Sequence, residues 1–211
     1  AVAEYDRAKI AIAIGKANAE VEAQERASGK EIEAILEHIE AKKKKRMLVE
    51  DIQDIIEEKL MEQAHYHDNK GIPRYSIVTS GRSLSQQEVD QACVSVARIR
   101  QETNLSVCVS FGLLQQEQFQ QLKEAGVSRI HNNLESSRRY FPQVCTTHSY
   151  DEKIATIRAA QQAGLTVCSG GIVGLGETME DRLDLAFTLR DLGIGSVPIN
   201  VLTPIAGTPY A

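Results

Sequence analysis

Residues 167–177 read VCSGGIVGLGE, and this stretch shows the repeating unit of the chain. A short apolar run ends in Cys168 and is followed by a turn rich in glycine. Glycine lets the backbone bend tightly and approach a ligand closely because it has no Cβ atom. Thr178 and Asp181 have the spacing of a capping box, which predicts that a helix starts there. The stretch therefore predicts a strand, a ligand-facing turn and a helix, and Gly170, Gly171 and Gly174 of the turn are candidate cofactor contacts.

The glycines of this turn do not indicate a Rossmann site. Their order is G-x-x-G-x-G. The fingerprint of dinucleotide-binding folds is G-x-G-x-x-G, in which the first glycine pair leads into the helix. The order is reversed here, so another class of ligand is expected.

The same unit of strand and helix occurs on both sides of this stretch. β-rich runs alternate with helical stripes and short loops, and this alternation requires parallel strands. We expect an α/β fold, a partial (β/α) TIM-type barrel of about five parallel β/α units, with ligand-binding residues at the carboxyl ends of the strands. A doubly wound sheet is the alternative. The five runs are residues 75–79, 106–110, 127–131, 165–172 and 196–202.

The first third of the chain has a different pattern. Three amphipathic stripes at residues 10–21, 32–39 and 52–60 predict a small three-helix segment. We therefore divide the chain into a helical domain, residues 1–66, and a barrel domain, residues 67–211. The basic run KKKKR at residues 42–46 is interpreted as a solvated loop, and a phosphate-facing patch is the alternative.

Composition narrows the class of protein. The chain has 211 residues, 42% of them hydrophobic, and a net charge of −5. A negative net charge is not typical of a nucleic-acid-binding protein, and the apolar runs are too short to span a bilayer. Four cysteines without paired spacing do not form a disulfide scaffold. We expect a soluble, cytoplasmic protein that binds neither nucleic acid nor membrane. The sequence leaves open whether it forms a homodimer.

Several segments resemble the biotin synthase family, which belongs to the radical S-adenosylmethionine (radical SAM) enzymes. They are YSIVTSGR, LSVCVSFGLL, NNLESS and the long run from TTHSY to AGTP, and together they cover about residues 71–211. The resemblance implies a sulfurtransferase of biotin biosynthesis that inserts sulfur into dethiobiotin by radical chemistry. It also implies S-adenosylmethionine, a 4Fe–4S cluster and a 2Fe–2S cluster as cofactors.

Two cysteines are candidate metal ligands. Cys108 and Cys168 lie near the ends of predicted strands, and the resemblance implies that they bind the 2Fe–2S cluster. From residue type alone, a small buried hydrophobe is the favoured interpretation of each cysteine, and the resemblance reverses this preference. A third family cysteine falls at Ser76, so the ligand set is partial. Cys93, on a helical stripe, and Cys145 are interpreted as structural.

Three polar residues are candidate ligand contacts. Asn133 and Glu135 follow the third strand, where amide and carboxylate groups suit ribose hydroxyls and a ureido ring. The resemblance implies that both bind S-adenosylmethionine and that Asn133 also binds the substrate, whereas loop capping is the alternative. Asn200 matches a substrate-binding asparagine, and an asparagine within an apolar strand needs a hydrogen-bond partner.

One family motif is absent from the sequence. Radical SAM enzymes hold their 4Fe–4S cluster with C-x-x-x-C-x-x-C, but the cysteines here are residues 93, 108, 145 and 168. The cofactor carries the difficult step in such enzymes, so we expect the chain as written to be inactive. A catalytically silent fragment, chimeric or truncated, is therefore a second hypothesis beside the enzyme.

A third hypothesis comes from the first third of the chain. Residues 5–62 resemble the ATP-cone, the nucleotide-binding regulatory domain of ribonucleotide reductases of the anaerobic type. The resemblance implies a nucleotide contact at Lys9 and leaves ATP binding open. An allosteric nucleotide-binding module is thus the remaining alternative.

Overall fold

The computed structural model describes residues 2–4, 32–37, 46–205 and 207. Strand β1 (Val2–Glu4) pairs antiparallel with β2 (Arg46–Leu48), and helix α3 (Val49–Asn69) follows. Residues 32–37 are also helical. Lys9 and most of the two earlier helical stripes lie outside the described residues, so the predicted three-helix segment and the ATP-cone resemblance stay untested there.

Four strands form one parallel sheet in the order β3, β4, β5, β6. The strands are β3 (Arg74–Val78), β4 (Ser106–Ser110), β5 (Val127–His131) and β6 (Thr166–Cys168). They are connected through α4 (Gln86–Glu102), α5 (Gln116–Ala125), the short α6 (Phe141–Val144) and α7 (Tyr150–Gln162). The predicted partial TIM-type α/β fold with parallel strands is confirmed.

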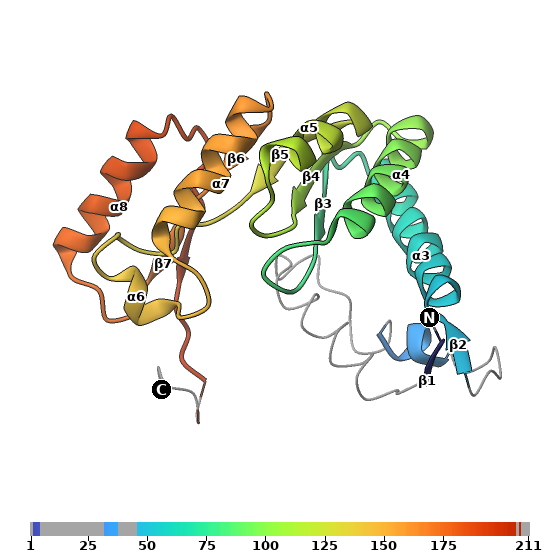
Figure 1. Ribbon diagram of the computed structural model, residues 1–211, viewed down its shortest axis with the longest axis horizontal. Helices are drawn as coiled ribbons and strands as arrows, with labels where there is room; N and C mark the ends of the chain where they lie inside the picture. The colour runs from blue at the N-terminus through green and yellow to red at the C-terminus, as the bar shows by residue number, and fades with distance from the viewer. Residues whose placement is uncertain (1, 5–31, 38–45, 206, 208–211) are drawn as a thin grey trace.

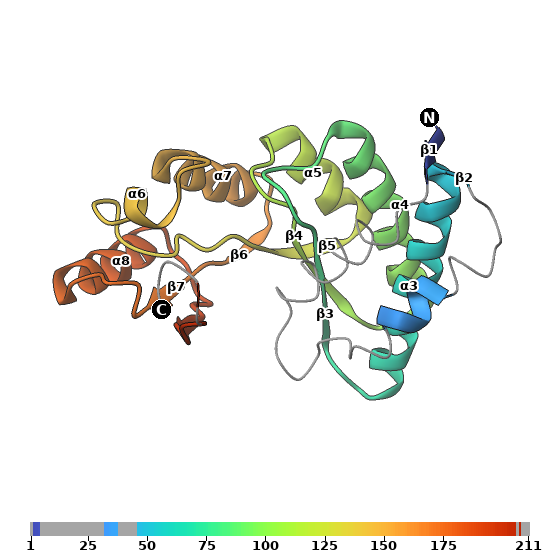
Figure 2. The ribbon, with the colours of Figure 1, turned by 90° about the horizontal axis from the view of Figure 1, so that it is seen from below.

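The helices α4, α5 and α7 lie side by side along one face of this sheet, and α3 lies next to α4 (Figures 1 and 2). Alternate residues of a strand point to opposite faces. Val107 and Val109 of β4 accordingly join the core between sheet and helices, with Val96 and Leu122 from the helices. Each of these four side chains is almost fully buried.

The helix start predicted at Thr178 is confirmed, and two other helices begin in the same way. Three helices begin with a complete capping box: Ser85 with Glu88, Ser149 with Glu152, and Thr178 with Asp181. In each box, the Ser or Thr hydroxyl oxygen accepts from the backbone N–H of the acidic residue, and the acidic side chain accepts from the backbone N–H of the Ser or Thr. Gly126 ends α5 with a φ of 109°, a left-handed conformation that glycine adopts without a steric penalty. These local signals fix the boundaries of the helices.

The predicted strand at residues 165–172 is interrupted. It forms β6 and a separate β7 (Gly171–Val173), and β7 pairs in parallel with β8 (Ile199–Val201). Helix α8 (Met179–Asp191) connects β7 to β8. Bridges between Glu135 and Gly171 and between Cys168 and Ser196 continue the pairing across the break. The count of five units stays a prediction, because it depends on counting β6 and β7 as one strand.

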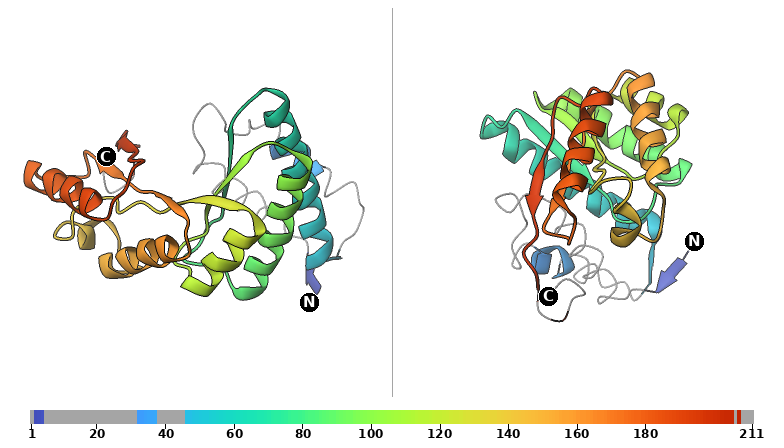
Figure 3. Two further views of the ribbon diagram at one scale, coloured as in Figure 1. Left: turned by 90° about the horizontal axis from the view of Figure 1, so that it is seen from above. Right: turned by 90° about the vertical axis from the view of Figure 1, so that its left-hand side faces the viewer.

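The division of the chain at residue 66 also stays a prediction. Helix α3 runs across it without a break, and its residues Met61 and Ala64 belong to the same core cluster as the sheet. The pair β7–β8 with α6 and α8 forms the other end of the molecule (Figure 3). Among the described helices, none combines the length and the apolar character needed to cross a bilayer.

Candidate functional site

The face of the sheet that points away from the helices carries both candidate cysteine ligands. Cys108 lies beside Ser76 on one neighbouring strand and beside Arg129 on the other. His131, two residues after Arg129, lies beside Cys168. Because residues two apart on a strand share a face, the register places Cys108 and Cys168 on the same polar surface.

Polar contacts connect these side chains. Arg129 Nη1 donates to Ser196 Oγ at 3.4 Å, and Ser196 Oγ donates to Cys168 Sγ at 3.4 Å. Burial raises the pKa of the Cys108 thiol, while a hydrogen bond with Ser76 and the charge of Arg129 act in the opposite direction. The thiol is therefore protonated at neutral pH, and any metal must displace its proton to bind.

The residues present fit the two iron–sulfur clusters of the family to different degrees. The sequence contains no C-x-x-x-C-x-x-C triad, so its residues do not fit the 4Fe–4S cluster. Cys108 and Cys168 offer two thiols for a second cluster, but no group of three or more histidine, cysteine or acidic side chains converges within the described part of the chain. The second cluster thus has a partial ligand set here.

A pocket of about 410 Å³ lies beside this surface, at the carboxyl ends of β3, β4 and β5. Parallel α/β sheets bind ligands at this edge, because the loops after the strands converge there. The predicted residues Asn133 and Glu135 both line the pocket, and so does Lys153 from α7. The other lining residues are Val78, Thr79, Ser80, Gly81, Ser110, Gly112, His131 and Asn132.

Glu135 and Lys153 both line this pocket, and the charge of Glu135 acts on Lys153. Burial lowers the pKa of Lys153, and the negative charges of Glu135 and Cys145 act against that shift. Glu135 has a φ of 66°, and among the described residues it is the one non-glycine residue with a positive φ. Such a backbone conformation costs about 1–3 kcal/mol and is typical of ligand-binding sites.

The two asparagines of the loop after β5 have different roles. Asn133 Oδ1 accepts a hydrogen bond from the Gly170 backbone N–H at 2.9 Å, which ties the loop to the break between β6 and β7. Asn132 is only 5% exposed, and its Oδ1 has no hydrogen-bond partner among the described residues. A buried acceptor of this kind is costly unless a ligand or water donates to it.

The three predicted glycines and Asn200 do not line this pocket. A Cβ atom on Gly170 would lie 1.8 Å from the Pro198 carbonyl oxygen, and one on Gly171 would lie 2.5 Å from that of Glu135. Close backbone packing therefore explains these two glycines. Gly174, with a φ of 94°, donates its N–H to Glu177, and Asn200 is exposed on β8. Their predicted roles stay predictions.

Lys153 and Asn132 were not among the residues predicted from the sequence. Lys153 follows the Ser149–Glu152 capping box directly, and nothing in the local pattern distinguishes it from a solvated lysine of a first helical turn. Asn132 stands next to Asn133, so the doubled asparagine was the one available signal. Both residues reach the pocket because α7 and the loop after β5 pack around it.

Comparisons with known proteins agree with the partial α/β barrel described above. The sequence profile of the Radical SAM superfamily matches residues 41–189. Biotin synthase from Akkermansia muciniphila is 56% identical over 163 residues, which are 77% of this chain and 51% of that protein. Biotin synthase from Heliobacterium modesticaldum is 58% identical over 147 residues, which are 70% of this chain and 45% of that protein. The chain thus spans about half the length of these relatives.

The solved structure of methylornithine synthase has a similar fold, with a TM-score of 0.66 at 18% identity. The match covers 72% of this chain and 45% of that protein. The resemblance of residues 5–62 to an ATP-cone gains no support from these comparisons. The superfamily match covers most of the chain and includes the sheet, the pocket and both candidate cysteine ligands. The chain belongs to the Radical SAM superfamily.

Proposed function

We propose that this chain forms the part of a biotin synthase-type enzyme that binds S-adenosylmethionine and a dethiobiotin-like substrate. The observation that carries the proposal is the pocket at the strand ends, which brings Asn133, Glu135 and Lys153 together. Identities above 50% to biotin synthases support it, because these matches extend over 70% or more of the chain. The reaction assigned is sulfur insertion by a radical SAM sulfurtransferase.

The polar groups of the pocket match the chemistry of such ligands. The Glu135 carboxylate suits the hydroxyls of a ribose, and the Lys153 ammonium suits a carboxylate. The Asn132 and Asn133 amides suit the N–H and C=O groups of a ureido ring. With a volume of about 410 Å³, the pocket lies within the usual size range of small-molecule sites.

Titration calorimetry of the purified chain tests this binding role. We expect saturable binding of S-adenosylmethionine, with at least about a tenfold loss of affinity in Glu135→Gln and in Lys153→Met, because each removes a charge from the pocket. The exposed cation Arg190 lies on α8, outside the pocket, so Arg190→Met is the matched control and should bind as the unaltered chain does. Equal affinity in all four proteins would contradict the proposal.

We further propose that Cys108 and Cys168 bind iron as part of the sulfur-donating 2Fe–2S site. Their shared face and the neighbouring Arg129 and Ser76 support this assignment. After anaerobic reconstitution with iron and sulfide, Cys108→Ala and Cys168→Ala should each lose most of the bound iron. Cys93→Ala is the control, and equal losses in all three variants would indicate adventitious binding to thiols.

A catalytically silent fragment is the second candidate, and the missing cysteine triad favours it. The 211-residue chain alone should therefore not cleave S-adenosylmethionine. The assay is 5′-deoxyadenosine formation by the reconstituted protein with a strong reductant. Turnover above a blank without protein would overturn this expectation and leave the binding role in place.

A further inference from the structure

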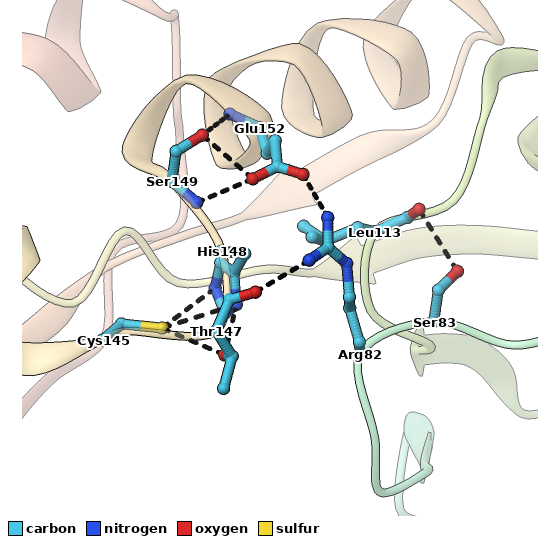
Figure 4. A network of polar contacts seen from close by, with 8 residues as sticks. All are labelled: Arg82, Ser83, Leu113, Cys145, Thr147, His148, Ser149 and Glu152. Carbon is cyan, nitrogen blue, oxygen red and sulfur yellow. Dashed lines mark hydrogen bonds and ion pairs between the residues drawn. The ribbon is translucent and has the colours of Figure 1, made fainter.

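A second polar network lies outside the pocket, where residues 145–152 meet the loop after β3 (Figure 4). Arg82 Nη1 donates to the Thr147 carbonyl oxygen at 2.7 Å, and Arg82 Nη2 pairs with Glu152. Glu152 is also the acidic member of the capping box with Ser149. These contacts hold the segment between α6 and α7 in one conformation.

Cys145 is the thiol of this network. Its Sγ lies 3.4 Å from Thr147 Oγ1 and 3.4 Å from His148 Nδ1 (Figure 4). The His148 ring packs against Phe141 with a centroid distance of 5.7 Å, which fixes the imidazole beside the sulfur. Cys145 is partly exposed, so reagents in solution reach it.

The positive charge of Lys153 acts on this thiol. Burial tends to raise the pKa of Cys145, but hydrogen bonds from Thr147 and His148 and the charge of Lys153 outweigh it, and the pKa is lowered. Burial and the charges of Lys153 and Arg82 lower the pKa of His148, and Glu152 acts in the opposite direction. The imidazole is therefore neutral at pH 7, while Lys153 supplies the nearby positive charge.

Two other cysteines provide an internal contrast. Burial and the charges of Asp90 and Glu124 raise the pKa of Cys93, and burial also raises that of Cys108. A thiol reacts through its thiolate form, so both are disfavoured as nucleophiles at neutral pH. Cys145 differs from them in geometry, since it is partly exposed and has a histidine nitrogen, His148 Nδ1, 3.4 Å from its sulfur.

We propose that Cys145 is a thiol-modification site that forms mixed disulfides with low-molecular-weight disulfides. The Cys145 thiolate attacks one sulfur of the disulfide and forms a new S–S bond, and the other sulfur leaves as a thiolate with the electron pair of the broken bond. The proton of the Cys145 thiol passes to solvent. This role goes beyond the structural role that the sequence suggested for Cys145.

The modification also bears on the pocket. Lys153 lines the pocket and interacts with the charges of both Glu135 and Cys145. A mixed disulfide at Cys145 is neutral at every pH, so the modification removes the negative charge that the thiolate form places on this lysine. The network therefore links the redox state of Cys145 to the cation of the pocket.

The test is the rate of reaction of each cysteine with 4,4′-dithiodipyridine, followed by peptide mass spectrometry of the full chain at pH 7. We expect Cys145 to react at least about tenfold faster than Cys93 and Cys108, because a larger fraction of it is thiolate. The fast phase should disappear in Cys145→Ser. A fast phase that persists in this variant would assign it to another thiol and overturn the proposal.

A lysine variant separates electrostatic activation from simple exposure. Lys153→Met should shift the midpoint of the pH–rate profile of Cys145 upward, so that the rate falls severalfold at pH 7 and recovers at high pH. Lys123 of α5, which bonds the Gly164 carbonyl, gives the matched control Lys123→Met with an unchanged profile. A profile that is identical in all three proteins, or a rate for Cys145 no higher than for Cys93, would overturn the proposal.

Discussion

The two ends of the molecule are built from the same β/α pattern but differ in burial. In the region of β3–β6, helices α4, α5 and α7 cover the sheet, and Val96, Ile99 and Leu122 are fully buried. In the region of β7, β8 and α8, large apolar side chains are exposed: Met179, Leu183, Phe187, Ile199 and Val201. The α8 end therefore leaves a larger share of its large apolar side chains exposed than the sheet covered by three helices does.

The spacing on α8 explains this contrast. Met179, Leu183 and Phe187 are four residues apart, so they form one apolar stripe on one side of the helix. Leu185 and Leu189 form the buried side. Within the described residues, no element covers the exposed stripe, and both stripes together make α8 apolar around much of its circumference.

The largest effect should come from truncating matched leucines in the two regions. Leu122→Ala in α5 should lower the free energy of unfolding by about 2–5 kcal/mol, because it leaves a cavity in a closely packed core. Leu183→Ala in α8, where the side chain is 49% exposed, should change it by less than about 0.5 kcal/mol. Denaturant titrations of both variants measure the difference, and equal losses would refute the contrast.

The exposed stripe should also promote self-association. We expect Phe187→Glu to weaken association of the chain by about tenfold or more, because it places a charge in a contiguous apolar patch. Val94 is an exposed apolar residue on α4, away from α8, so Val94→Glu is the control and should leave association unchanged. Sedimentation velocity over a range of concentrations gives the result. A monomer at all concentrations would show that the stripe does not drive association.

Removal of the helix caps should show whether the two regions unfold together. Ser149→Ala at α7 should cost about 1 kcal/mol of global stability, the usual value for loss of a cap. Thr178→Ala removes the same interaction at α8. If α8 opens independently, this second loss appears in amide hydrogen exchange of α8 and not in the global unfolding transition. The same global loss in both variants would mean that the two regions unfold as one.

The smallest expected effect depends on pH. Hydrogen bonds from Ser137 and Thr178, with the charge of Arg139, lower the pKa of Asp181 from 3.8 to about 2, against the effect of burial. A carboxyl group with a lowered pKa stabilises the fold above its unfolded pKa, and this contribution is lost as pH falls toward the folded value. The melting temperatures of the protein and of Asp181→Asn should therefore differ at pH 6 and converge between about pH 4 and pH 2. A constant gap across this range would contradict the assignment.

Local signals in the sequence predicted much of the fold. The bounds of β4 and β5 and the capping box of Thr178 with Asp181 agree with expectation. The break between β6 and β7 was not predictable, because it depends on the approach of the Pro198 carbonyl oxygen to Gly170, a contact between segments far apart in sequence. The local sequence pattern does not contain this contact and therefore predicted one continuous strand over residues 165–172.

The candidate site was predictable only in part. Asn133 and Glu135 follow a strand end, and this placement is visible in the sequence. Lys153 reaches the same pocket from α7, and its position depends on how that helix packs against α5 and the sheet. The same is true of the positive charge near Cys145. Contacts of this kind arise from tertiary packing and leave no local pattern.

Chemical-shift mapping tests the central claim, that the pocket at the ends of β3, β4 and β5 binds S-adenosylmethionine. The ligand is titrated into the ¹⁵N-labelled chain, and the amide signals are followed. We predict that the largest shifts occur at Gly81, Gly112, Asn133 and Glu135, which line the pocket, with little change along α8. Shifts centred on α8 and β8, or no shifts at saturating ligand, would contradict the account.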